Sequence, residues 1–330
     1  MTSARAAEKA ATVVRRKRLA PVRRWLRLLG TAGSLGLAAW LLVIVVPHIA
    51  GGGWSGILAQ FQGIGIGVLI GLAVLWFGGL WAYTYVLTGS LPGLRNGQAF
   101  ALNAAGSAVS NLLPFGGAAG VAVTAAMASS WGHTVPAIAT STVVSGVWNI
   151  AARLVLPVLA VIALAGSGVV VDQRVITVTW VAAAVLAAAL VVLALPERWL
   201  KWAPIVVRSR QNISAVVRTG WAKMTVGMGV YLALQGVLLW ACLSATGVWL
   251  GLGATVAAFA VSRLLTLVVI TPGGVGVTEN GTIALLVALG HPAASAAAGV
   301  LLFAFFTFAI EIPVGGLAWL IWSVRRARSA

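Results

Sequence analysis

The chain has 330 residues, of which 61% are hydrophobic and only 8% are charged, and its mean hydropathy is +1.03. This composition excludes a soluble globular domain, because apolar runs of about 20 residues, the length that crosses a bilayer, recur between residues 28 and 323. The formal net charge is +17. The basic residues sit beside apolar spans, which the positive-inside rule explains better than a nucleic-acid partner does.

The chain begins with a basic segment, residues 1–27, which we expect to lie against anionic headgroups on the cytoplasmic side. Apolar runs then predict six full spans, at about 28–50, 64–88, 138–165, 175–195, 224–247 and 294–323. Residues 97–131 and 254–291 are predicted to form two helical hairpins, each broken at its tip. The predicted fold is all-α, a polytopic integral membrane helical bundle, with a single transmembrane domain over 28–323.

The distribution of Lys and Arg predicts the topology. These residues concentrate in 1–27, in the loop 196–223 and in the tail 324–330, so all three are expected in the cytoplasm. Six crossings, together with two hairpins that each return to the side they entered from, place all three basic segments on the same side of the membrane. The first hairpin then enters from the cytoplasm and the second from outside.

The two hairpin tips carry similar sequences, NLLPFGGAAG and TPGGVG. Proline lacks an N–H and ends a helix, while glycine adopts the dihedral angles that a break requires. The hinge candidates are Pro114, Gly116, Gly117, Pro272, Gly273, Gly274 and Gly276. Two copies entering from opposite faces predict an inverted repeat with halves 64–165 and 224–323. Re-entrant hairpins and pairs of short full spans both remain compatible with the lengths of the arms.

Polar side chains recur at every fourth position on two of the predicted helices. One face carries Asn103, Ser107 and Asn111, and the other carries Ser141, Ser145, Asn149 and Arg153. Unpaired polar groups are unfavourable in lipid, so both faces are expected to point inward.

Four charged residues lie at predicted membrane depth: Arg153, Arg263, Glu279 and Glu311. A charge there costs several kcal/mol, roughly 2.5–3.5 on insertion scales, so we expect the four to converge on one cavity with an Arg–Glu contact when it is empty. The planar guanidinium suits phosphate oxygens, and the carboxylates could balance the charge or take up a proton. The substrate-binding candidates are Arg153, Arg263, Glu279, Glu311, Asn111, Asn149 and Asn280. The alternative is that the charges are static ion pairs between helices.

Other chemistry has little support in the sequence. There is no Gly-rich loop followed by Lys-Ser/Thr, so direct nucleotide hydrolysis is not expected. His48, His133 and His291 are scattered, and no Ser/His/Asp constellation is visible. We therefore expect no metal, no cofactor and no enzymatic activity.

The motif PGG-x-G-x-x-E, formed by Pro272, Gly273, Gly274, Gly276 and Glu279 with Arg263 upstream, resembles the lysylphosphatidylglycerol synthetase transmembrane (flippase-domain) family. The resemblance covers essentially residues 28–323. It implies a lipid-translocating module of the bacterial inner membrane. No soluble domain follows Ser329 in this sequence, so aminoacyl transfer to lipid is not assigned.

The leading hypothesis is therefore a lipid translocase that moves an anionic or phosphate-bearing lipid, or a lipid-linked intermediate, between leaflets without ATP. The alternative is a non-transporting membrane partner or scaffold of a separate lipid-modifying or polyprenyl-glycosyl enzyme.

Overall fold

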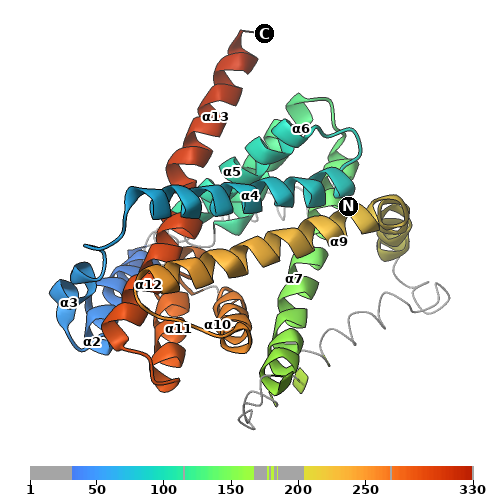
Figure 1. Cartoon of the computed structure of the whole chain (residues 1–330). Helices are drawn as coiled ribbons and strands as arrows, with labels where there is room; N and C mark the ends of the chain where they lie inside the picture. The colour runs from blue at the N-terminus through green and yellow to red at the C-terminus, as the bar shows by residue number, and fades with distance from the viewer. Residues whose placement is uncertain are drawn as a thin grey trace, which may run out of the picture.

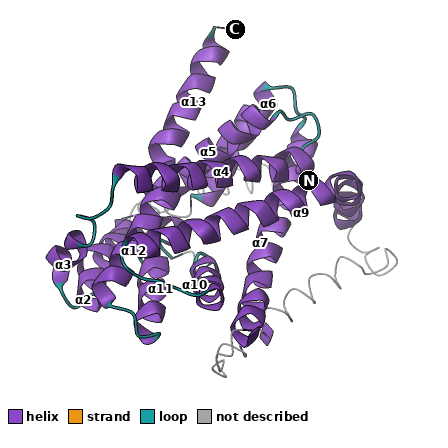
Figure 2. Cartoon of the chain, viewed as in Figure 1, coloured by secondary structure: helices purple, strands orange, loops and turns teal. Residues whose placement is uncertain are grey.

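The computed structural model describes residues 32–113, 116–166, 204–267 and 270–328, and the single positions Thr177, Trp180, Val181 and Ala184. Within the described residues every regular element is a helix (Figure 2). The predicted all-α fold is confirmed. The segment 1–27, the hinge candidate Pro114 and most of the predicted span 175–195 lie outside the described residues.

The helices follow one another in the order expected from the apolar runs (Figure 1). Their bounds are η1 Leu41–Val45, α2 Val46–Ile49, α3 Gly53–Ala59, α4 Ile66–Ser90, α5 Asn96–Leu112, α6 Gly117–Ser130, α7 Val135–Gly166, α9 Pro204–Ala245, α10 Leu252–Leu265, η3 Pro272–Gly274, α11 Val277–Ala288, α12 Ala293–Ala304, η4 Phe305–Ala309 and α13 Glu311–Ala327.

Five helical stretches in the described residues are long and apolar enough to cross a membrane: Ala32–Ile49, Ile66–Ser90, Val135–Gly166, Ile213–Ala245 and Ala293–Ala327. They coincide with five of the six predicted spans. Large apolar side chains point outward from them, such as Ile66 at 74% exposure. In a bilayer this outward surface contacts lipid instead of water. The chain is a multi-pass membrane protein.

Helix α9 is longer than the sequence predicts. Residues 196–223 are expected to form a loop, yet the backbone is helical from Pro204 onward and continues to Ala245, over 42 residues. A helix of that length measures about 63 Å, roughly twice the hydrocarbon thickness. Its N-terminal part therefore extends beyond a simple span. The cytoplasmic position of this region stays a prediction.

Helices α4 and α9 lie side by side and antiparallel across the molecule (Figure 1). Small residues allow the close approach: a Cβ built on Gly220 would overlap the carbonyl oxygen of Gly89. About two turns further along α9, a Cβ on Gly227 would lie 2.7 Å from the Cβ of Tyr85. Glycine contacts of this kind are how membrane helices gain van der Waals packing.

The two hairpins exchange partners between the halves of the chain. Helix α5, in the first half, packs on α13 of the second half, where a Cβ on Gly315 would overlap the Ala104 carbonyl oxygen. Helix α10, in the second half, packs on α7 of the first half, where a Cβ on Gly253 would lie 2.9 Å from the Ala163 carbonyl oxygen. Each hairpin thus packs against the last span of the opposite half.

Candidate functional site

The helix is interrupted at the second hairpin tip. Helix α10 ends at Leu265 and α11 begins at Val277, with the short 3₁₀ turn η3 between them. Gly273, Gly274 and Gly276 have φ angles of 60°, 77° and 85°. Residues with a side chain rarely adopt such angles, so the three glycines stand at the positions where this turn requires them.

Two of these glycines are also required for space. A Cβ on Gly273 would lie 2.7 Å from the Phe308 ring, and one on Gly276 would lie 2.6 Å from the Cβ of Leu41. The turn is therefore pressed between the first span and the segment η4. Whether it moves as a hinge stays a prediction.

Glu279 closes this turn. Its carboxylate oxygen Oε2 accepts a hydrogen bond from the backbone N–H of Gly276, and only 5% of the residue is exposed. A carboxylate three residues into a helix is well placed to satisfy the free N–H groups at its start. Part of the role of Glu279 is therefore to cap α11.

The first hairpin tip is equally tight in its described part. A Cβ on Gly116 would lie 2.5 Å from the carbonyl oxygens of both Ser110 and Leu113. The hydroxyl of Ser110 donates to the Gly116 carbonyl at 3.4 Å. Gly117, by contrast, has open space around it and borders the cavity described below.

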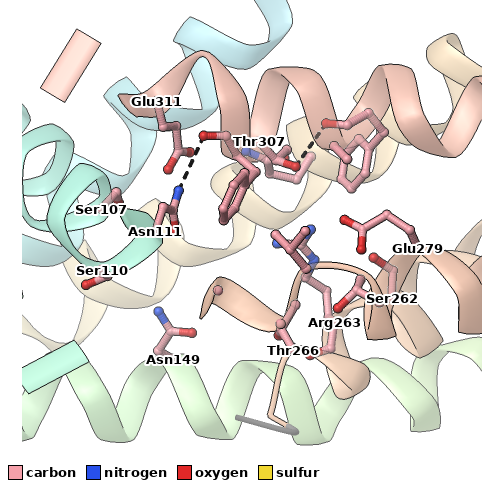
Figure 3. A pocket seen from close by; sticks show the side chains of 18 of the residues that line it. Ser107, Ser110, Asn111, Asn149, Ser262, Arg263, Thr266, Glu279, Thr307 and Glu311 are labelled. Carbon is pink, nitrogen blue, oxygen red and sulfur yellow. Dashed lines mark hydrogen bonds between the residues drawn. The ribbon is translucent and has the colours of Figure 1, made fainter. Parts of the chain in front are cut away.

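The two tips approach each other inside the molecule. A Cβ on Gly273 would lie 3.1 Å from Oδ1 of Asn111, the last polar residue of α5. The amide of Asn111 donates to the Phe308 carbonyl at 3.5 Å, as Figure 3 shows. Phe308 belongs to η4, a π-helical segment, and such segments are frequent at functional sites.

A cavity of about 440 Å³ lies where these elements meet (Figure 3). It is bordered by all four charged residues expected at membrane depth, namely Arg153, Arg263, Glu279 and Glu311. Asn111 and Asn149 also border it, together with glycines of both tips. The lining thus comes from both halves of the chain.

Arg153 is held by a neutral partner. Its Nη1 donates to the hydroxyl of Thr266 at 3.0 Å, and that hydroxyl donates to the Arg263 carbonyl at 2.6 Å. One turn earlier on α7, the amide of Asn149 donates to the Tyr83 hydroxyl at 3.2 Å. These contacts orient the two side chains without neutralising the guanidinium.

Arg263 is held between two aromatic rings. Its guanidinium carbon lies 5.2 Å from the ring centroid of Phe259 and 5.4 Å from that of Phe303. Both distances are in the range of cation–π attraction. Its Nε is buried and has no hydrogen-bond partner among the described residues. The rings fix the position of this cation and leave a donor unused.

The prediction that an Arg and a Glu form an ion pair in the empty cavity is wrong. In the part of the chain that the structure describes, none of the four charges forms an ion pair within 4.0 Å. The reason is local: Thr266 engages Arg153, aromatic rings engage Arg263, and the α11 turn engages Glu279. Static ion pairing between helices is therefore not what the site shows.

Asn280 does not border the cavity. Its amide donates to the carbonyl of Leu41 at 3.1 Å and to that of Gly276 at 2.7 Å. It faces the first span and ties it to the turn. Asn280 directly follows Glu279 on α11, and consecutive residues on a helix point in different directions.

A second cavity, of about 460 Å³, continues the first along α5 and α7. Both cavities share the border residues Tyr83, Asn103, Ser107, Ser110, Asn111, Gly117 and Asn149. The second one then follows Ser145 and Ser141 on α7. The two polar faces identified in the sequence thus line two adjoining cavities, which together we call the polar passage. Apolar residues such as Leu102 and Ile138 also border the second cavity.

Several lining residues escaped the sequence analysis. Thr266 lies three residues after Arg263 and therefore on the same helix face, which was a usable indication. Phe303 and Tyr83 gave no such indication, because an aromatic residue in an apolar span looks the same whether it faces lipid or a cavity. In the described residues, no group of three or more His, Cys, Asp or Glu side chains gathers as metal ligands do.

Comparison with known proteins gives one result for nearly the whole chain. The family model of the lysylphosphatidylglycerol synthase transmembrane region matches residues 27–315. A search of curated proteins finds no match. The matched range begins before the first span and includes every border residue of the central cavity, from Leu80 to Glu311.

Proposed function

The chain belongs to the lysylphosphatidylglycerol synthase transmembrane-region family, a family of membrane proteins for lipid modification or translocation, and from this premise we propose that it is a lipid translocase. It moves a phosphate-bearing lipid, or a lipid-linked intermediate, between leaflets without ATP. It acts in the bacterial inner membrane with both termini in the cytoplasm, and no catalytic reaction is assigned to it.

The observation that carries the proposal is the pair Arg153 and Arg263 on one cavity, each held by neutral groups. Both arginines are half-buried, and neither forms a direct ion pair with Glu279 or Glu311, which border the same cavity. A lipid phosphate would supply a direct anionic partner and would accept charge-assisted hydrogen bonds from both guanidinium groups. The site is thus suited to an anion that arrives from outside the protein.

The polar passage offers a route for the headgroup. Serine and asparagine side chains on α5 and α7 replace water around a phosphate as it moves toward the arginines, while the acyl chains stay in the lipid. The exchange of partners between the hairpins supports an inverted repeat. In such folds one half moves against the other around a fixed site, which alternates access between the two leaflets.

Reconstitution tests the function. We expect vesicles that contain the protein to move phosphatidylglycerol between leaflets without nucleotide, faster than protein-free vesicles. Lipid extracted from the purified protein should be enriched in phosphate-bearing species, and the enrichment should fall in Arg263→Ala but not in Arg218→Ala, an exposed arginine of α9.

The same measurements distinguish lipid transport from the alternative, a membrane partner that does not transport lipid. Lipid that binds in an Arg263-dependent way but does not move faster than in protein-free vesicles would contradict transport. That result would favour a membrane partner of a lipid-modifying enzyme, as the family assignment also allows.

A further inference from the structure

A separate basic cavity lies at the base of the first hairpin. It has a volume of about 800 Å³ and is formed where the beginning of α5, the end of α6 and the last turns of α13 meet. It shares no border residue with the central cavity. Its basic border residues are Arg95, Arg325 and Arg326, and none of its border residues is acidic.

The arginines are brought together from distant parts of the chain. Arg95 precedes α5, whereas Arg325 and Arg326 belong to the last turn of α13. The close packing of α5 on α13 places them on one cavity. All three side chains are exposed, and a cluster of like charges at one cavity attracts anions from its surroundings.

Aromatic side chains shape the same cavity. The indole N–H of Trp322 donates to the hydroxyl of Ser130 at 2.9 Å, which ties α13 to the hairpin. The guanidinium carbon of Arg326 lies 5.6 Å from the Trp322 ring centroid. Trp131 borders the cavity as well. Tryptophan with arginine at the end of a span is typical of the headgroup level of a bilayer.

The remaining border is apolar. Ala101, Ala318 and Ile321 line the part of the cavity that lies deeper along α5 and α13. A cavity with arginines at the helix ends and small apolar side chains along the helices matches the polarity of a lipid near its glycerol and phosphate groups. It matches a fully hydrated anion less well, because such an anion would make no apolar contact with these three side chains.

We propose that this cavity binds a phosphate-bearing anion, most favourably the phosphate of a membrane lipid, at a site distinct from the central cavity. The guanidinium groups donate to the phosphate oxygens, and the Trp322 ring supports Arg326. The proposal does not depend on translocation, because the site would hold its ligand whether or not the protein moves lipid.

Native mass spectrometry of the full chain tests the proposal. The protein in neutral detergent is titrated with phosphatidylglycerol, and in a second arm with glycerol phosphate in water. The double variant Arg95→Gln/Arg326→Gln should lose one bound molecule or bind it roughly 10- to 30-fold more weakly, since each basic side chain contributes to anion attraction. Arg218→Gln, which removes an exposed charge elsewhere, should bind as the wild type does.

Lysine variants sharpen the result. Arg95→Lys/Arg326→Lys keeps the charge but loses the planar fork, so binding should fall between that of the wild type and that of the glutamine variant. A loss confined to phosphatidylglycerol identifies the ligand as a lipid, and an equal loss of glycerol phosphate identifies a soluble one. If the glutamine variant binds both probes as Arg218→Gln does, the site does not exist.

Discussion

At the scale of single residues, the central cavity holds its cations with neutral groups. Thr266 accepts a hydrogen bond from Arg153, and aromatic rings flank Arg263. Such contacts fix position while leaving the charge available, whereas a carboxylate contact would neutralise it. A lipid phosphate therefore does not have to displace a protein carboxylate in order to bind.

The contact between Arg153 and Thr266 can be measured. Thr266→Val keeps the shape of the side chain and removes the acceptor, so it should destabilise the protein by about 1.5–3 kcal/mol, as expected for a hydrogen bond to a charged group. Thermal unfolding in detergent gives the change, with Thr219→Val on the exposed face of α9 as the control. In an Arg153→Gln background the loss should be smaller. Equal losses in both backgrounds would mean that the contact does not contribute.

The capping role of Glu279 predicts a difference between two substitutions. Glu279→Gln retains an oxygen that can accept from the Gly276 N–H, so the fold should be preserved. Glu279→Ala leaves that buried N–H unpaired, which costs about 1–3 kcal/mol. Unfolding temperatures of both variants provide the measurement. Two equally stable variants would show that the turn does not need the acceptor.

At the scale of elements, glycines set how the hairpins pack on the opposite half. Gly315 of α13 lies against the Ala104 carbonyl of α5, whereas its neighbour Gly316 has nothing within 4 Å of a built Cβ. The two positions have the same residue type in the same helix. They therefore isolate packing from helix propensity.

Gly315→Ala should separate α5 from α13 and destabilise the protein by about 1–3 kcal/mol, as overpacking does. Gly316→Ala should be neutral or slightly stabilising, because alanine favours helix and meets no neighbour. Chemical or thermal unfolding in detergent compares the two. If Gly315→Ala is as stable as Gly316→Ala, the close approach of α5 to α13 is not important for the fold.

The helices and the break at the second motif could be predicted from the sequence, because span length, proline and glycine act locally. The glycine-rich turn at Gly273–Gly276 is one example. Thr266 could be placed on the same helix face as Arg263, but the pairing of the arginines with their neutral partners could not be predicted. Thr266 and Phe303 contact them only because distant helices meet, and no local pattern records that meeting. The N-terminal extension of α9 was predicted to be a loop because it is rich in basic residues. Such residues indicate a cytoplasmic position but do not exclude a helix.

At the scale of the whole molecule, contacts between segments that are distant in sequence are consistent with the predicted topology. Ser295 donates to Gln60 and accepts from Thr246, so the first loop and the region around the second hairpin lie together. Arg95 and Arg326 meet at the other cavity described above. The two hairpin bases therefore contact different partners, as hairpins that enter from opposite faces would.

Cysteine labelling in intact cells tests which end faces the cytoplasm. In a Cys242→Ala background, Ser55→Cys should react with an impermeant reagent added outside, because Ser55 is exposed and precedes the second span. Arg328→Cys should react only after the membrane is opened. Reversed labelling would contradict the topology and the inverted repeat together.

The most direct test of lipid translocation through the central cavity compares Arg153→Lys/Arg263→Lys with the wild type in reconstituted vesicles. The variant keeps both charges but loses the planar donors, so at equal protein content the rate of phosphatidylglycerol movement should fall at least about tenfold, as for the loss of one charged hydrogen bond. Arg218→Lys should match the wild type. A double lysine variant that moves lipid at the wild-type rate would show that these two guanidinium groups do not bind the lipid during transport.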